Sequence, residues 1–223
     1  MPWPTCSDNK QNQGEEEIDC GGPCSSCALK HPEDMSVLWA RFVQVRENTY
    51  DAVAEVRNSN IKLGAADFEY VFRFYDDQGV LVAERDSHSF VFPGETIHPV
   101  AVNVKTQRTL KRATFTVKNI KWLFTDKISP DVVVGDKQFK TDPLKKISSL
   151  TAALINRSLT DFQEVFLNAL ILDKTGNVIV VSNITEKDLL SGETRPVVFS
   201  WPISVSELAP FIIIEARVNA VAK

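Results

Sequence analysis

The sequence has no cysteine after Cys27, only three histidines, and no apolar run long enough to cross a membrane as a helix. His31, His88 and His98 lie far apart in the chain and in none of the spacings typical of metal sites, so surface positions are expected for all three. No glycine-rich phosphate-binding motif and no G-x-S-x-G motif occurs. The sequence therefore predicts no nucleotide site, no catalytic residue and a protein that is not an enzyme.

An excess of positive charge is also lacking. The 25 Lys and Arg residues stand against 29 Asp and Glu residues, and the net charge of −4 leaves no basic footprint for nucleic acid. What the sequence has is an ordinary hydrophobic fraction of 43% and 13 phenylalanines among many Val, Ile and Thr residues. This composition is sufficient for a buried core and favours strands over helices.

From Ser36 onward the chain consists of short alternating apolar runs separated by turn residues, at intervals of about ten residues. In the first run, residues 37–45, apolar residues occupy both alternating faces, so this strand is expected to be buried on both sides. Only Glu186 to Leu190 and Val205 to Leu208 look locally helical. The expected strands are 37–45, 50–57, 68–75, 80–84, 89–92, 98–104 and 113–124, then 132–134, 147–156, 162–172, 178–181, 195–201 and 211–218.

Three turn elements of the first half recur in the second half at nearly constant distance. The pairs are Asn58 and Asn156 at 98 residues, Gly79 and Gly176 at 97, and Gly94 and Gly192 at 98. Since turn residues fix strand register, equal spacing between turns indicates equal strand lengths. The sequence thus predicts an all-β protein with two tandem Ig-like antiparallel sandwiches, each of about 100 residues.

The expected division is a cysteine-rich module over residues 1–35, a first sandwich over 36–129 and a second over 130–223. Sandwiches of this size fill their interiors with side chains, so a partner is expected to dock between them, near Phe124 to Val134. The loops Asp76–Gly79 and Asp173–Gly176 are the next candidates.

All four cysteines, Cys6, Cys20, Cys24 and Cys27, fall in an acidic segment that has too few apolar residues for a core. Such a segment needs crosslinks, and two structural disulfides are the leading interpretation. Four cysteines allow three pairings, among which sequence does not choose. We favour Cys6–Cys24 with Cys20–Cys27, because a Cys24–Cys27 bond would close a tight ring typical of redox motifs.

Two metal sites are alternatives for this segment. The cysteines could hold zinc, although zinc ribbons use two C-x-x-C pairs and only one is present. The oxygen atoms of Asp8, Asn12, Glu15 and Asp19 are of the kind that Ca²⁺ requires, although their spacing does not fit an EF-hand. For these acidic residues the simpler interpretation is a solvated loop.

The spacing of this segment follows the pattern C-x-D-G-x-x-N-x-x-E-x-x-x-D-C-G-G-x-C-x-x-C. The matching positions are Cys6, Asp8, Asn12, Glu15, Asp19, Cys20, Gly21, Gly22, Cys24 and Cys27, with Asn9 in place of the first glycine. The segment resembles a module of secreted or surface-anchored bacterial proteins. With its tandem sandwiches, the chain looks like bacterial envelope proteins of uncharacterised function, and Phe74-Tyr75-Asp76 is similar to the FxLyD-type sandwich motif.

The resemblance implies an extracytoplasmic place, in the cell envelope or secreted, and brings no activity with it. Met1-Pro-Trp-Pro lacks the basic and apolar regions of a signal peptide, so an export signal or membrane anchor is expected upstream of Met1. The leading hypothesis is a non-enzymatic protein that presents its sandwiches to a protein or surface-polymer partner. The alternatives are a carbohydrate-binding or accessory module of a larger enzyme system, and a zinc-binding cytosolic adaptor.

Overall fold

The computed structural model describes residues 5–205 and 211–221, and in them it confirms an all-β fold of antiparallel sheets behind a disulfide-bonded module. The described residues contain no α-helix, and their one helical element is a single 3-10 turn, η1 (Cys27–Leu29). None of these residues forms a helix long and apolar enough to span a membrane. Strand pairing is confined to β1 through β8 or to β9 through β14, which gives two sandwiches.

In the first sandwich, one sheet has the order β1-β2-β5, with β6 also paired to β2. The facing sheet has the order β4-β3-β7, with β8 also paired to β3. The strands are β1 (Ser36–Arg46), β2 (Thr49–Arg57), β3 (Leu63–Tyr75), β4 (Leu81–Val91), β5 (Thr96–Ile97), β6 (Val100–Lys105), β7 (Arg112–Lys118) and β8 (Trp122–Phe124).

The second sandwich has two three-stranded sheets, with the orders β13-β10-β9 and β12-β11-β14. Its strands are β9 (Val132–Asp142), β10 (Ile147–Asn156), β11 (Phe162–Leu172), β12 (Val178–Leu189), β13 (Thr194–Trp201) and β14 (Phe211–Arg217).

The two cores differ in composition although the strands correspond. Aromatic rings fill the first core, where Phe72 contacts Phe115 with ring centroids 4.8 Å apart. Aliphatic side chains dominate the second, which includes Leu150, Leu154, Val165, Leu167 and Ile171. Strands of similar length therefore accommodate different packing, because each core is filled by its own set of side-chain volumes.

The two regions predicted to be locally helical have different outcomes. Glu186 to Leu190 is not helical: the segment up to Leu189 continues β12, where Lys187 lies opposite Glu164 of β11. Its Glu, Lys and Leu residues favour a helix locally, but the ladder to β11 overrides that preference. Residues 206–208 of the other region lie outside the described residues.

Two strand boundaries also differ from expectation. The predicted strands 80–84 and 89–92 form one strand, β4, since the polar residues between them pair with β3 along the sheet edge. The predicted strand 113–124 is instead divided into β7 and β8 at Asn119, whose φ of 50° breaks the extended backbone.

The repeated asparagines make equivalent hydrogen bonds to backbone carbonyl oxygens in both sandwiches. The buried amide of Asn58 donates to the carbonyl oxygens of Leu63 at 2.7 Å and Phe92 at 2.9 Å. Asn156 is equally buried and donates to two loop carbonyl oxygens at 2.8 and 3.0 Å. Each amide thus ties the loop that follows its own strand to a second turn, which precedes β5 in the first sandwich and β13 in the second.

The repeated Asp-x-x-Gly turns are also equivalent. In each, the carboxylate of the first residue, Asp76 or Asp173, accepts hydrogen bonds from the backbone N–H groups two and four residues later. The glycines Gly79 and Gly176 take φ values of 77° and 80°, which a residue with a Cβ atom adopts only under strain. The turn residues seen in the sequence therefore have one structural cause in both halves.

We expect Asn156→Ala to lower the free energy of unfolding by about 2 kcal/mol, because it leaves buried carbonyl oxygens without their donor. Urea denaturation followed by fluorescence measures the change. The matched control is Asn183→Ala, at an exposed asparagine of β12, which should change the midpoint very little. Equal effects of the two substitutions would contradict the anchoring role of Asn156.

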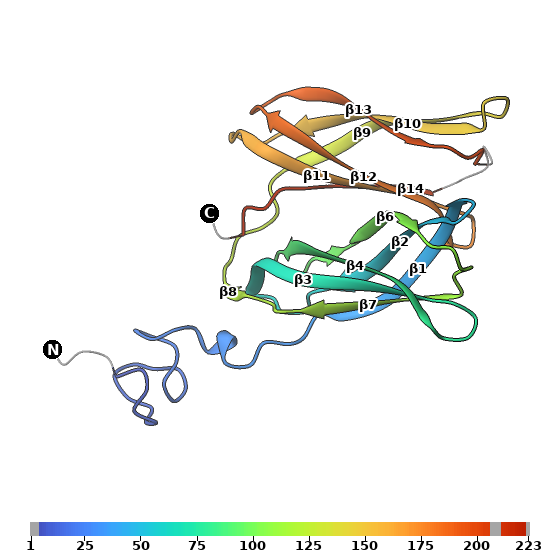
Figure 1. Ribbon diagram of the computed structural model, residues 1–223. Coiled ribbons are helices and arrows are strands. Elements are labelled where there is room, and N and C mark those ends of the chain that lie inside the picture. The colour runs from blue at the N-terminus through green and yellow to red at the C-terminus, as the bar shows by residue number, and fades with distance from the viewer. Residues whose placement is uncertain (1–4, 206–210, 222–223) are drawn as a thin grey trace.

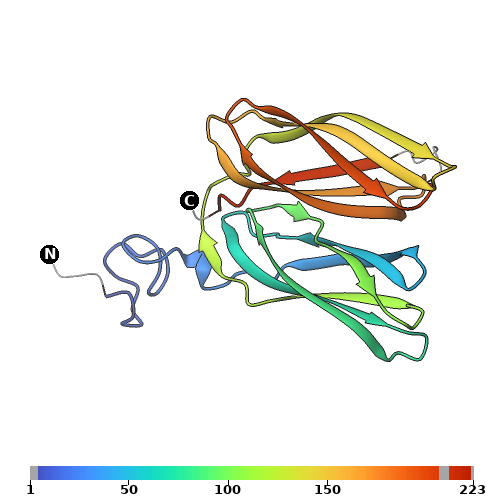
Figure 2. The ribbon, with the colours of Figure 1, turned by 45° about the horizontal axis from the view of Figure 1, so that its top comes forward.

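The two sandwiches lie side by side, and the N-terminal module extends away from them (Figures 1 and 2). Strand β12 of the second sandwich packs against β1, β2 and β6 of the first. The contact has a dry centre made of Val53, Val100, Leu170 and Val181. This contact accounts for apolar residues on both faces of β1, since Phe42 faces its own core and the indole of Trp39 joins the cluster between the sandwiches. The expected burial on both faces does not extend to the start of the strand, where Val37 and Leu38 are exposed.

Candidate functional site

The N-terminal module contains both expected disulfides, Cys6–Cys24 and Cys20–Cys27, which is the pairing we favoured. No cysteine is free, so none offers the thiolate that a structural zinc ion requires. The zinc-binding alternative is therefore not retained.

The four proposed calcium ligands are engaged in holding the loop. The carboxylate of Asp19 accepts hydrogen bonds from the backbone N–H groups of Asp8 and Asn9. Asp8 accepts from the Asn12 amide at 2.9 Å and from Thr5, and these bonds hold the pKa of Asp8 below its usual range. Glu15 accepts from the backbone of Asn12.

The three carboxylates of the proposed calcium site, those of Asp8, Glu15 and Asp19, do not come together as one cluster within the described residues. Asn12 Oδ1 is buried there without a hydrogen-bond partner, but Asp8 and Asp19 belong to no cluster of three potential ligands. The clusters that do form include cysteine sulfurs already bound in disulfides. The acidic residues thus act as acceptors for the N–H groups of a segment that has no core.

A buried arginine fixes the two sandwiches to each other at one end of their contact. Arg217 of β14 donates to both carboxylate oxygens of Glu95 at 3.1 Å and to the carbonyl oxygen of Phe90 at 2.6 Å. Its guanidinium also lies 4.3 Å from the centre of the Phe90 ring. Because Arg217 is only 7% exposed, these bonds are shielded from water.

A histidine makes the second link, where the sequence predicted a surface position. The His98 side chain is 12% exposed, with Nδ1 2.5 Å from Glu215 and Nε2 3.4 Å from Glu55. The prediction was wrong for His98 because the covering residues come from the other sandwich. His31 and His88 are exposed as expected.

The charge of His98 depends on competing effects. Burial disfavours the charged imidazole, but hydrogen bonding and attraction by Glu215, helped by Glu55, outweigh it and raise the pKa of His98. Glu55 is itself held by the indole N–H of Trp39 at 2.8 Å. The link is therefore strongest when His98 carries its proton.

We expect the stability difference between the wild type and His98→Gln to depend on pH. A raised pKa in the folded state stabilises fully below the unfolded value, near 6.5, and the contribution disappears as pH rises through the folded value. The difference should be roughly 2 kcal/mol at pH 5.5 and should shrink above pH of about 6.5.

Urea midpoints of both proteins between pH 5 and 9 measure this difference. The exposed His31→Gln variant is the control and should follow the wild type. A gap between wild type and His98→Gln that stays constant over the whole range would contradict the ionic link.

Between these links the sandwiches diverge and leave a groove of about 480 Å³. One wall is the outward face of β11 and β12, on which paired positions change from apolar to polar along the strands. Leu170 lies opposite Val181 in the dry contact, and Asn168 lies opposite Asn183 in the groove. Next along the same face, Phe166 pairs with Thr185.

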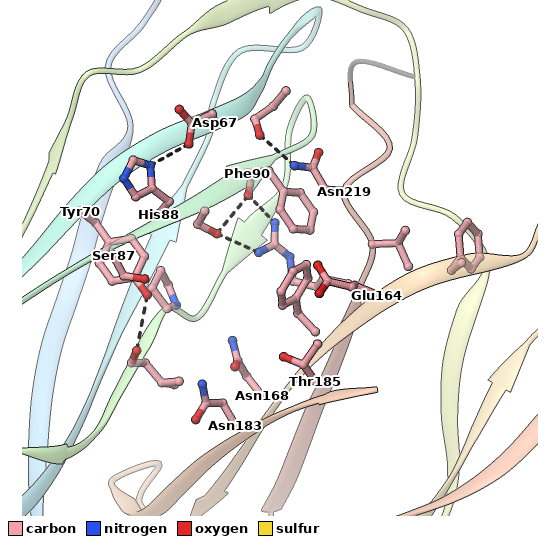
Figure 3. Close-up of a pocket in the computed structure, with 18 of the residues that line it drawn as sticks. Asp67, Tyr70, Ser87, His88, Phe90, Glu164, Asn168, Asn183, Thr185 and Asn219 are labelled. Atoms are coloured by element: carbon pink, nitrogen blue, oxygen red, sulfur yellow. Dashed lines mark hydrogen bonds and ion pairs between the residues drawn. The ribbon is translucent and has the colours of Figure 1, made fainter. Parts of the chain in front are cut away.

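The other wall comes from β3 and β4 of the first sandwich. Figure 3 shows Tyr70 and Ser87 on that side of the cavity, with Asn168, Asn183 and Thr185 on the other. Burial raises the pKa of Tyr70, so this phenol stays protonated, and it donates to the carbonyl oxygen of Val100 at 3.5 Å.

Most charges around the groove are already paired. Asp67 accepts from Lys121 Nζ at 2.6 Å and lies 2.8 Å from His88 Nδ1, and the bond from Lys121 contributes most to lowering the pKa of Asp67. Glu164 makes no hydrogen bond or ion pair within the part of the chain that the structure describes. The groove thus presents amides, hydroxyls, aromatic rings and one unpaired carboxylate.

Docking was expected between the sandwiches, and the groove is there, but residues 124–134 do not line it. The loop at Asp76 and Asp77 borders a separate hollow. Sequence reasoning also missed the exposed aromatic Phe166. Its signal was present, because Glu164, Phe166 and Asn168 alternate with the apolar residues of the same strand.

The sequence also indicated that the two linking residues of β14, Glu215 and Arg217, are unusual for their strand. Glu215 and Arg217 are two charged residues, spaced to share one face, in an otherwise apolar strand. The sequence alone did not say that another sandwich covers that face.

Comparisons with known proteins leave the function open. No family model matches the chain, and no curated protein matches its sequence. Among solved structures, a red sea bream transglutaminase is similar over 86% of this chain, with 9% identity and a TM-score of 0.28. The chain spans 32% of that structure, and a likeness at this TM-score supports no functional argument.

Proposed function

We propose that this chain is a non-enzymatic extracytoplasmic protein that binds a protein or a surface polymer in the groove between its two sandwiches. The observation that carries the proposal is the groove itself, whose walls come from both sandwiches and are held at two linking points. Because Arg217 and His98 fix those walls, the groove needs little reorganisation before a partner binds.

The charges around the groove favour binding over catalysis. General acid–base chemistry requires titratable groups that converge on one reacting atom with separated pKa values. Here Asp67 is paired with Lys121 and His88, and Arg217 with Glu95, while Glu164 pairs with no titratable group in the part of the chain that the structure describes. Amides and hydroxyls dominate the remaining surface.

The disulfides support the proposed compartment. Two intramolecular disulfides in a segment without a core are typical of oxidising surroundings outside the cytoplasm. The module extends away from the two sandwiches (Figure 1).

The test uses the purified full chain and the isolated envelope fraction of the source cells. Asn183→Trp fills the groove with an indole, and Thr151→Trp places the same indole on an exposed position of β10. We expect saturable binding by the wild type, at least tenfold weaker binding by Asn183→Trp, and no change for Thr151→Trp.

Two results would overturn the proposal. Equal binding by both tryptophan variants would show that the groove is not the docking site. Chemical conversion of the bound partner by the wild type, lost in Glu164→Gln, would show that the protein is an enzyme.

A further inference from the structure

We propose that the groove binds a neutral, hydroxyl-rich saccharide chain. The inference rests on the proposed function and selects the surface polymer from its two partner classes. Four features of the groove support this inference. They are amide and hydroxyl groups without hydrogen-bond partners in the described residues, an exposed aromatic ring, the pairing of nearby cations, and walls whose edge strands carry charged residues that discourage pairing with a peptide.

The polar groups of the floor need a ligand that both donates and accepts hydrogen bonds. Asn168 uses its N–H group on the carbonyl oxygen of His98 at 2.9 Å, which orients its Oδ1 as a remaining acceptor. The side chains of Asn183 and Thr185 make no hydrogen bond within the described residues. Neighbouring hydroxyl groups of a sugar match such mixed donors and acceptors, since each hydroxyl does both.

Phe166 supplies a flat apolar surface beside these groups. It is 38% exposed, and its ring centroid lies 6.0 Å from that of buried Phe90, which supports it from behind. The face of an aromatic ring carries negative potential, so it attracts the slightly positive C–H groups on the flat side of a sugar ring. Phe166 thus supplies the exposed aromatic surface on which a sugar ring can stack.

The charge distribution selects a neutral saccharide over an anionic one. The cations nearest the groove, Arg217 and Lys121, are held by Glu95 and Asp67. Lys187 stands opposite Glu164 in the strand register but does not line the groove. A phosphate or carboxylate would therefore meet the unpaired Glu164 without a cation, whereas sugar hydroxyls can donate to it.

The walls disfavour a peptide as the occupant. Strand β11 pairs with β12 on one side and β14 on the other, so its backbone offers no free edge for strand addition. Strands β4 and β12 are edge strands, but each carries a run of charged residues, Glu84 to Asp86 in β4 and Glu186 to Asp188 in β12, and charges of this kind discourage further pairing. The volume of about 480 Å³ lies within the range of small-ligand sites.

The experiment measures binding of the full chain to soluble neutral hexasaccharides by calorimetry. The panel comprises β-1,4-linked glucose, mannose, xylose and N-acetylglucosamine, together with α-1,4-linked glucose. Polygalacturonate and an unstructured neutral peptide of similar length are the anionic and peptide comparisons. We expect at least one neutral saccharide to bind with a Kd below 1 mM, and more tightly than either comparison ligand.

Three groove variants and one matched control locate the binding. Phe166→Ala should weaken it at least tenfold, and Asn183→Ala and Thr185→Val about threefold to tenfold each. Phe124→Ala removes another exposed phenylalanine, which lies at the junction and does not line the groove, and this variant should bind as the wild type does. Unchanged thermal unfolding of each variant shows that the fold is intact.

The inference is overturned if no neutral saccharide binds, if Phe166→Ala binds normally, or if the peptide binds more tightly than every saccharide. It also has an outcome separate from that of the proposed function. If Asn183→Trp abolishes envelope binding but glycan removal from the envelope does not, the groove remains a docking site and the saccharide is wrong.

Discussion

Replacement of Arg217 by methionine is expected to lower the free energy of unfolding by about 3 kcal/mol. Methionine keeps most of the length of the side chain but leaves the carboxylate of Glu95 and the carbonyl oxygen of Phe90 without their donor. Removal of one partner from a buried ion pair costs about 3–5 kcal/mol, and we take the lower value because Glu95 is partly exposed.

Urea denaturation of the full chain measures the effect, with Arg195→Met as the matched control. Arg195 pairs with Glu186 and Glu193, but its side chain is more exposed, so its replacement should cost about 1 kcal/mol or less. In the double variant Glu95→Gln/Arg217→Met the losses should be less than additive, because the two groups act on each other. A cost for Arg217→Met no larger than that for Arg195→Met would contradict the linking role.

Reduction of the two disulfides is expected to unfold the N-terminal module and to leave the sandwiches folded. The module has almost no buried apolar side chains, and each disulfide contributes about 2–5 kcal/mol by restricting the unfolded chain. The module makes few contacts with the first sandwich, and these include two hydrogen bonds between the backbone of Glu33 and the side-chain amide of Asn60. Its unfolding therefore does not remove either sandwich core.

Hydrogen exchange with and without reductant distinguishes the two parts. Amides of residues 5–30 should lose protection at least tenfold, while those of β3 and β11 should not change. The paired variant Cys6→Ser/Cys24→Ser should open the module more than Cys20→Ser/Cys27→Ser, because it releases a separation of 18 residues instead of 7. Retained protection of the module after full reduction would contradict this account.

Short-range features of this protein were determined by the sequence itself. The Asp-x-x-Gly turns, the strand alternation and the disulfide module depend on residues close together in the chain. Gly79 and Gly176 take positive φ values for a reason that is local to each turn. Asn58 and Asn156 revealed the repeat because each must satisfy the carbonyl oxygens of its own loop.

The tertiary structure decided the features that depend on the contact between sandwiches. Nothing near His98 in the chain indicates Glu215, which lies 117 residues away, so a surface position was the natural expectation. The segment after Ile184 prefers a helix locally, but it forms a strand because it pairs with the backbone of β11.

The groove has the same origin. Alternation places Glu164, Phe166 and Asn168 on one face of a strand, and the sequence determines that face. Whether it meets solvent, a dry contact or a cavity depends on how far the first sandwich extends over it. That extent is set by Val53 and Val100 packing on Leu170, and by the linking bonds of Arg217, which lines the groove. Local sequence cannot specify it, because each docking surface is formed by residues that only the folded chain brings together.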